Sequence, residues 1–270
     1  MRNFSICIFC ILLLSGCQKV VDVDLPTTDP RLIIDATFST FFDSGKKNVE
    51  GAVKLSLTAS FYSKELPPVN DATVYMTDMD TGDIVIFSES DNPGIYIPPV
   101  LSNFPVPNKT YKLSVIYKNE TYEGTATMIP TVPIDSLSQG DVTLLNDETE
   151  IIVSFTDEEN RSDFYLFDLD FNLFLTTYDQ FYQGQKFTFS YFYEDIEPGK
   201  EITVKINGVD EQFYNYMNIV ISQSGQNDVG PFPTPPAAVR GNMVNITNPD
   251  NYPLGYFAIS EAYKMSLIIE

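Results

Sequence analysis

The chain has 270 residues, of which 37 are acidic and 16 are basic, and it contains three cysteines and no histidine. At about 100–200 residues per domain, this length predicts one or two domains with enough chain to bury a hydrophobic core. The formal charge of −21 argues against a nucleic-acid-binding protein, because such proteins obtain much of their affinity from cations placed against phosphates. Because histidine is missing, Ser-His-Asp and Cys-His catalytic sites and imidazole-ligated metal sites are excluded.

The first residues have the pattern of an export signal. A positively charged start at Arg2 is followed by an apolar stretch of about 11 residues, which is too short to span a bilayer as a stable anchor. The motif Leu-Ser-Gly-Cys at residues 14–17 resembles a bacterial lipobox, in which small residues precede a lipid-modified cysteine. We therefore predict a lipoprotein signal peptide over residues 1–16 and lipidation of Cys17. The alternative is an ordinary secretory signal with an incidental cysteine.

Cleavage after residue 16 would explain all three cysteines. Cys7 and Cys10 would leave with the signal, and Cys17 would carry acyl chains at the new N-terminus. Two or three acyl chains hold a protein at a membrane, because each buried CH₂ adds about 0.8 kcal/mol. Residues 17–30 are polar and punctuated by proline, which predicts a lipidated tether between the membrane and the folded part.

The next part of the chain has the two-residue period of β-strands. Val53, Leu55 and Leu57 alternate with polar residues, and so do Tyr111, Leu113, Val115 and Tyr117. Residues 73–76 and 84–87 flank an Asp-Thr-Gly-Asp turn and predict a hairpin. About seven short strands at this spacing are typical of a sandwich. We predict an immunoglobulin-like or prealbumin-like β-sandwich domain over residues 31–138.

Residues 139–270 have longer and more aromatic strands. Residues 164–176 are expected to form one strand, with Asp168, Asp170 and Asn172 on its polar outer face. Apolar residues spaced i, i+3, i+4, i+7 and i+8 from Phe213 predict a helix at about 208–223. The fold class is therefore all-β, and the second domain is expected to be an antiparallel β-barrel-like or sandwich domain with one helix.

With these segments assigned, the chain resembles an uncharacterised family of Bacteroidota outer-membrane lipoproteins that is described as a domain of unknown function. The matching motifs are short and extend over nearly the whole chain, at residues 17–26, 71–74, 96, 111–115, 122, 134–137, 155–157, 179–185, 214–216, 248–249 and 254–257. The resemblance implies a two-domain β protein at the cell surface or on the periplasmic side of the outer membrane. It also implies a TonB-dependent transporter as partner, and it supplies no catalytic residues.

The aromatic run over residues 164–193 is the best candidate for a binding surface. Phe187, Phe189, Tyr191 and Tyr193 fall on one face of a strand, and aromatic faces stack on sugar rings or on apolar ligands. The alternative is that these side chains fill the core of the second domain. We expect Tyr178 and Tyr182, together with Phe232 in the proline-rich stretch at 230–236, to face outward and form a surface for a glycan, a small molecule or a partner.

The sequence offers few other candidates for chemistry. Asp78, Asp80 and Asp83 surround a glycine and are a weak candidate for a calcium site, because calcium takes clustered hard oxygens. A solvated hairpin turn explains the same residues. We predict no catalytic residues, no cofactor and no other metal site.

These features together predict a lipid-anchored, non-catalytic accessory protein of the outer membrane. It would capture a ligand or dock on a TonB-dependent transporter, and it would not bind nucleic acid. One alternative is a structural or adhesive envelope protein. The other is a carbohydrate-active hydrolase, which would need only two carboxyl groups at a set separation.

Overall fold

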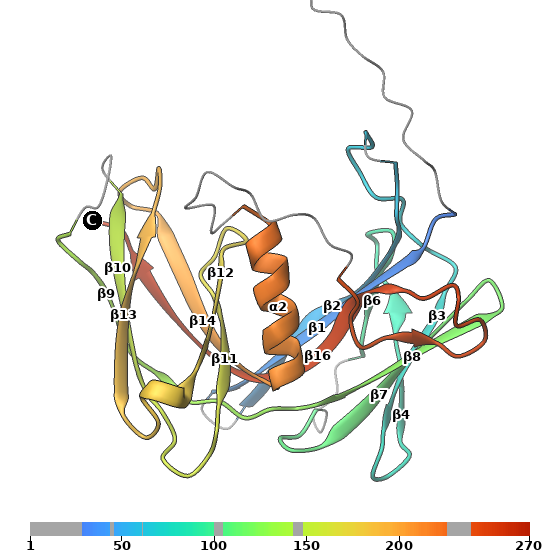
Figure 1. Cartoon of the computed structure of the whole chain (residues 1–270), viewed down its shortest axis with the longest axis horizontal. Coiled ribbons are helices and arrows are strands. Elements are labelled where there is room, and N and C mark those ends of the chain that lie inside the picture. Colours follow the sequence, from blue (N-terminus) through green and yellow to red (C-terminus); the bar gives the residue numbers. More distant parts are fainter. Residues whose placement is uncertain (1–28, 44–45, 61, 100–104, 143–147, 226–238) are drawn as a thin grey trace, which may run out of the picture.

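The computed structural model describes residues 29–43, 46–60, 62–99, 105–142, 148–225 and 239–270 (Figure 1). The chain is mostly β, as predicted, and no sheet of the described part closes into a barrel. The strands are β1 Leu32–Asp43, β2 Lys46–Leu57, β3 Thr73–Asp78, β4 Ile84–Ile86, β5 Ser88–Glu89, β6 Ile95–Ile97, β7 Thr110–Tyr117, β8 Glu120–Thr127, β9 Ile134–Gln139, β10 Thr149–Thr156, β11 Phe164–Asp168, β12 Phe174–Tyr178, β13 Lys186–Tyr193, β14 Glu201–Val209, β15 Val244–Asn245 and β16 Leu254–Ile268. The described helices are a short 3-10 turn, η1 Asp179–Phe181, and one α-helix, α2 Glu211–Gln223. Neither is long and apolar enough to cross a membrane.

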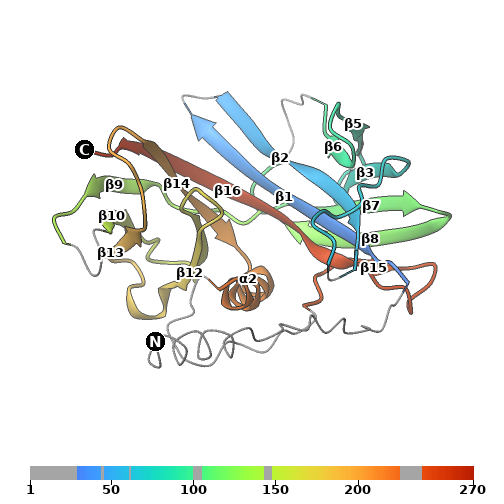
Figure 2. The same cartoon turned by 90° about the horizontal axis from the view of Figure 1, so that it is seen from above.

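The strands form three sheets. The largest has eight strands in the order β12-β11-β14-β16-β1-β2-β6-β5, and the others are β13-β10-β9 and β15-β8-β7-β3-β4. The predicted hairpin is present, because β3 pairs with β4 in antiparallel register. β16 runs parallel to β1 over nine residue pairs, from Ile33 opposite Leu254 to Phe41 opposite Ala262. Seen from above, β16 crosses the molecule between its two ends, with β1 beside its first part and β14 beside its last part (Figure 2).

One face of the eight-stranded sheet covers two hydrophobic cores. Near β1 and β2, Phe38 and Phe257 pack with side chains of the five-stranded sheet. Near β11 and β14, Phe167 and Val204 pack with side chains of the three-stranded sheet. Each of these four side chains is fully buried, and burial of such a side chain contributes about 1.5–3 kcal/mol. The result is two sandwiches that share one sheet, and β16 takes part in both.

Helix α2 packs on the opposite face of the shared sheet. Its Phe213 ring lies 4.7 Å from the ring of Tyr256 on β16, and Leu166 on β11 joins the same cluster. The helix begins later than predicted, at Glu211, because residues 208 and 209 still pair with β11. The side chain of Asp210 caps the helix by accepting a hydrogen bond of 2.7 Å from the Phe213 amide.

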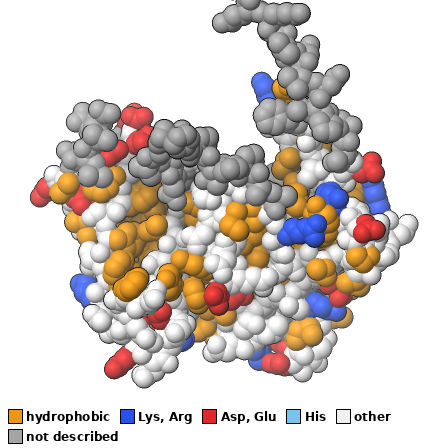
Figure 3. Space-filling view, viewed as in Figure 1, with side chains coloured by type: hydrophobic (Ala, Val, Ile, Leu, Met, Phe, Trp, Pro, Cys, Tyr) orange, Lys and Arg blue, Asp and Glu red, His pale blue; other side chains and the backbone are white. Residues whose placement is uncertain are grey.

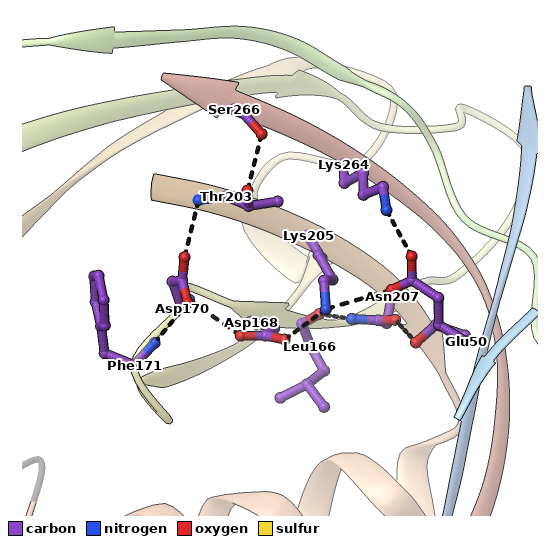
Figure 4. A network of polar contacts seen from close by, with 11 residues as sticks. Glu50, Leu166, Asp168, Asp170, Phe171, Thr203, Lys205, Asn207, Lys264 and Ser266 are labelled. Carbon is purple, nitrogen blue, oxygen red and sulfur yellow. Dashed lines mark hydrogen bonds and ion pairs between the residues drawn. The ribbon is translucent and has the colours of Figure 1, made fainter. Parts of the chain in front are cut away.

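The rest of the α2 side of the sheet is polar. Lys205 on β14 lies 3.3 Å from Asp168 on β11 and 3.7 Å from Glu50 on β2, and Lys264 on β16 lies 2.6 Å from Glu50 (Figure 4). Asn207 joins this row by donating to the Leu166 carbonyl. The ion pairs therefore connect strands of both sandwiches across the face that α2 leaves uncovered.

The predicted single strand over residues 164–176 is wrong. β11 ends at Asp168, and β12 starts at Phe174 and runs back antiparallel to it. Between them, Asp170, Phe171 and Asn172 have φ angles of 67°, 51° and 60°. Three successive residues in the left-handed region reverse the chain, so the two-residue period of the aspartates does not mark one strand face.

Candidate ligand-binding site

A cavity of about 800 Å³ lies at one end of the second sandwich, between the hairpin turn that follows β11 and the end of β13. β13 is an edge strand of the three-stranded sheet, and β12 is an edge strand of the eight-stranded sheet. Figure 3 shows hydrophobic side chains gathered on the lobe that contains these strands. The cavity is lined by Phe171, Leu173, Ser190, Tyr191, Phe192, Tyr193, Glu194, Asp195, Ile196, Glu197, Lys200 and Gly225.

Three of the lining rings are arranged at steep angles to one another. The Tyr191 and Tyr193 rings have centroids 5.0 Å apart and an interplanar angle of 72°. The Phe171 and Tyr193 rings are 6.4 Å apart at 86°. The hydroxyl of Tyr193 donates a hydrogen bond of 2.6 Å to the Leu169 carbonyl, and burial raises the pKa of this hydroxyl. Tyr193 is therefore fixed, and the other two rings are held against it.

The hairpin turn places Phe171 at the cavity. The Asp170 carboxylate accepts hydrogen bonds from the Phe171 amide (3.0 Å) and from the Thr203 amide (3.2 Å) on β14, as Figure 4 shows. The Asp168 side chain accepts a further bond from the Asp170 amide. These bonds stabilise a backbone conformation that residues with side chains rarely adopt. Phe171 is 46% exposed, so its ring is available to a ligand.

The charged residues of the cavity lie on the segment that joins β13 to β14. Glu194, Asp195 and Glu197 are exposed and carry three negative charges, and Lys200 carries one positive charge. The Lys200 ammonium group lies 5.6 Å from the centroid of the Phe171 ring, within the range of a cation–π contact. The cavity thus combines an aromatic wall with an acidic rim.

The residues predicted for the binding surface do not form this site. Tyr178 is exposed, and its ring stacks on Phe164 at 5.9 Å, outside the cavity lining. The prediction that Tyr182 faces outward is wrong, because it is only 6% exposed. Its ring stacks on Phe187 at 4.3 Å, and its hydroxyl shares a hydrogen bond of 3.0 Å with Thr177. Phe232 lies outside the described residues, as does Cys17.

The aromatic face of β13 contributes side chains both to the second core and to the cavity. Phe187, Phe189 and Tyr191 are partly buried and pack against the second core, and Tyr193 is buried in it. Tyr191 and Tyr193, at the end of the strand, also line the cavity. Phe171 reaches the cavity because the chain reverses after β11, whereas the two-residue spacing of the aspartates predicted a continuous strand there.

The weak calcium candidate is a hydrogen-bonded turn. The Asp78 carboxylate accepts bonds from the amides of Asp80 (2.8 Å) and Thr81 (3.2 Å). The Lys109 ammonium group lies 3.7 Å from Asp78 and 3.5 Å from Asp80, so a cation of the chain itself balances these charges. No group of three or more Cys, Asp or Glu side chains among the described residues is arranged to hold a metal ion.

A second group of carboxylates is buried near the start of β11. The Tyr165 hydroxyl donates to Asp157 and to Asp163, and the Arg161 side chain bonds to Asp163 at 2.5 Å. Burial raises the pKa of the Asp157 carboxyl. Both carboxyl groups are 5% or less exposed and neither lines the cavity, so this pair connects loops of the second sandwich.

The fold and the cavity define a β protein of two sandwiches that share a sheet, with an aromatic cavity of small-molecule size at one end. Residues 18–266 match the model of DUF4249, a domain of unknown function, and the chain belongs to that family. The predicted membership of an uncharacterised family is thereby confirmed.

Other comparisons add little. No curated protein sequence matches the chain. Among solved structures, it is similar to the FN1–FN3 domains of chicken CNTN1, with 8% identity, a TM-score of 0.25, and coverage of 67% of this chain and 60% of that one. It is also similar to the chicken interferon gamma receptor alpha chain, with 12% identity, a TM-score of 0.19, and coverage of 67% and 90%. The chain thus spans less than two thirds of the first structure, and neither likeness bears on function.

Proposed function

We propose that this chain is a lipid-anchored, non-catalytic accessory protein of the Bacteroidota outer membrane that captures a small ligand in its aromatic cavity. A TonB-dependent transporter is the partner to which such a ligand would be passed. The cavity between the β11–β12 turn and the end of β13 is the observation that carries this function. Its volume of about 800 Å³ falls within the range of about 300–1,000 Å³ that is typical of small-molecule sites.

The composition of the cavity supports binding. Six of its twelve lining residues are aromatic or aliphatic and four are charged, and binding pockets combine apolar walls with polar groups that orient the ligand. The wall is also preorganised, because Tyr193 is held by the Leu169 carbonyl and Phe171 by the Asp170 turn. Ligand binding would therefore cost little conformational entropy in the side chains of the wall.

Further observations support the proposed membrane location and the non-catalytic role. The lipobox-like motif at residues 14–17 supports anchoring through Cys17, and the family resemblance supports the outer membrane. The chain has no imidazole to act as a general base. The cavity's carboxylates, Glu194, Asp195 and Glu197, sit side by side on one exposed segment, whereas glycoside hydrolysis uses two carboxyl groups that flank the substrate.

The test is a binding screen on the full chain, purified in detergent from the membranes of cells that produce it. Native mass spectrometry would be run with neutral oligosaccharides, amines, short peptides and fatty acids. We expect one ligand class to bind with one molecule per chain and to be recovered chemically unchanged. Conversion of the ligand to a product would contradict the non-catalytic role.

Two phenylalanine variants locate the site. Phe171→Leu removes an exposed ring from the cavity, and Phe181→Leu removes a ring that is 85% exposed on η1 and does not line it. We expect the first to weaken binding about tenfold or more, since a ring contact contributes roughly 1–2 kcal/mol, and the second to leave it unchanged. A screen without any ligand, or a ligand insensitive to Phe171→Leu, would overturn ligand capture at this site.

A further inference from the structure

Building on the ligand-capture function proposed above, we infer that the cavity takes an organic cation, that is, an ammonium group carried on a small apolar body. The Phe171 and Tyr191 rings would contact the ammonium group, and the carboxylates of the segment between β13 and β14 would balance its charge.

The exposed aromatic wall can attract a cation. The face of an aromatic ring is negative and its edge is positive, and the Phe171 ring, which is 46% exposed, is available at the cavity. An ammonium group is attracted by each ring face that it contacts within about 6 Å. The Tyr193 ring is only 2% exposed, so it supports the Phe171 and Tyr191 rings from behind, and these two rings would contact the ligand.

The charge of the lining points the same way. The lining residues carry three carboxylates and one ammonium group, and the whole chain carries a formal charge of −21. A field of this sign attracts cations from solution and repels anions. Because Glu194, Asp195 and Glu197 are exposed, their attraction is screened by salt over about 10 Å at 0.1 M ionic strength.

The chain itself already places an ammonium group at this wall. The Lys200 ammonium group lies 5.6 Å from the centroid of the Phe171 ring, and the lysine is exposed to solvent. Lysine carries its charge on a flexible chain with several rotatable bonds, so the side chain is able to swing out when a ligand enters. The contact shows that an alkylammonium group fits against this ring.

The test compares a cation with a neutral molecule of the same shape. Choline and 3,3-dimethylbutan-1-ol differ only in a nitrogen and its charge, and binding of each to the full chain would be measured by isothermal titration calorimetry. We expect choline to bind about tenfold more tightly at low salt, which is the size of a desolvated cation–π contribution. The advantage should shrink when ionic strength rises from about 0.02 to 0.5 M.

Variants separate the two sources of attraction. Phe171→Leu should reduce choline binding about tenfold with Phe181→Leu as its matched control. Glu197→Gln keeps the shape of the rim and should reduce choline binding severalfold while leaving 3,3-dimethylbutan-1-ol unaffected. Unchanged melting temperatures would show that the variants are folded.

Two results would overturn the inference. In the first, both molecules bind equally, or a neutral oligosaccharide binds more tightly than choline and is lost in Phe171→Leu; the cavity would then capture a neutral ligand, and the proposed function would survive. In the second, choline does not bind, or binds equally well to Phe171→Leu. If, in addition, no ligand in the wider screen responds to Phe171→Leu, the proposed function fails as well.

Discussion

At the scale of single residues, Glu120 is the most heavily bonded carboxylate of the first sandwich. It accepts hydrogen bonds from the hydroxyl of Tyr122 (2.6 Å) and from the side-chain amides of Asn245 (3.0 Å), Asn248 (3.1 Å) and Asn251 (2.6 Å). The hydrogen bond from Tyr122 is the largest cause of its lowered pKa, and the asparagine amides add to it. Through this carboxylate, the start of β8 holds the segment that follows β15.

We predict that Glu120→Gln lowers the free energy of unfolding by about 1–2 kcal/mol, because hydrogen bonds to a charged acceptor are stronger than those to a neutral one. The folded pKa lies below the unfolded one. The contribution of Glu120 is therefore present above the ordinary glutamate pKa of 4.5 and is lost as pH falls through the folded pKa. Urea unfolding at pH 7 and at about pH 3 measures both effects.

The difference between Glu120→Gln and the unchanged chain should therefore be large at pH 7 and small at about pH 3. Glu65→Gln is the control, because Glu65 is exposed on a loop and its replacement should change stability by less than about 0.5 kcal/mol. An equal loss at both pH values would show that the ionised form of Glu120 is not what stabilises this segment.

At the scale of elements, α2 depends on both a cap and a packed face. Asp210 satisfies the Phe213 amide at the start of the helix, and the Phe213 and Tyr216 rings pack on Tyr256 at 4.7 Å and 4.8 Å. The packed face holds the helix on the sheet. The cap fixes where it begins, directly after β14.

We predict that Asp210→Ala destabilises the protein by about 1 kcal/mol, the usual effect of removing an N-cap side chain. Gln212→Ala is the matched control, because it changes an exposed position in the same turn to the best helix-forming residue. Thermal unfolding followed by circular dichroism measures both. A neutral Asp210→Ala would mean that packing alone determines the start of the helix.

The elements that could be predicted from sequence are those whose signal is local. β7 alternates Tyr111, Leu113, Val115 and Tyr117 toward the core, and the spacing from Phe213 identified α2. The turn at residues 170–172 contains no glycine or proline, and its turn-forming residues, Asp170 and Asn172, have a two-residue spacing that also fits one face of a strand. Because the turn was not predicted, the position of Phe171 at the cavity was not predicted either.

Pairings between distant segments could not be predicted. Ile33 lies opposite Leu254 in a parallel pair, and nothing in either segment specifies a partner more than two hundred residues away. The inward orientation of Tyr182 could not be predicted either, because it depends on Phe187 and Thr177 lying beside it. Residue type predicted an aromatic core with some surface-exposed rings, and only packing determined which rings are exposed.

At the scale of the whole molecule, the shared sheet couples the two sandwiches. β16 contributes Phe257 and Ile259 to the first core and supports the second core with Tyr263, Met265 and Leu267. Neither sandwich keeps its sheet if β16 leaves. The molecule is therefore expected to unfold as one unit.

We predict one calorimetric transition whose van't Hoff and calorimetric enthalpies agree. Val74→Ala in the first core and Val153→Ala in the second remove side chains that are fully buried. Each should lower the melting temperature of this single transition by about 5 °C, because the loss of about 2 kcal/mol shifts a protein of this size by that amount. Two transitions, of which each variant moves only one, would show independent sandwiches.

The proposed membrane anchoring is a second property of the whole chain. We predict that Cys17→Ser abolishes metabolic labelling with an alkyne analogue of palmitate and releases the protein from the membrane fraction, because the acyl chains would supply its anchor. Cys10→Ser, in the apolar stretch, is the control and should keep both label and location. Labelling that persists in Cys17→Ser would contradict the lipoprotein assignment.

The most direct measurement is a crystal structure of the full chain with choline. The predicted result places the trimethylammonium group against the Phe171 and Tyr191 rings, with the Lys200 side chain moved away and the Glu197 carboxylate within a few ångströms of the charge. Choline bound elsewhere, or absent from this cavity at saturating concentration in a lattice that leaves its mouth open, would contradict the proposal that this end of the second sandwich captures an organic cation.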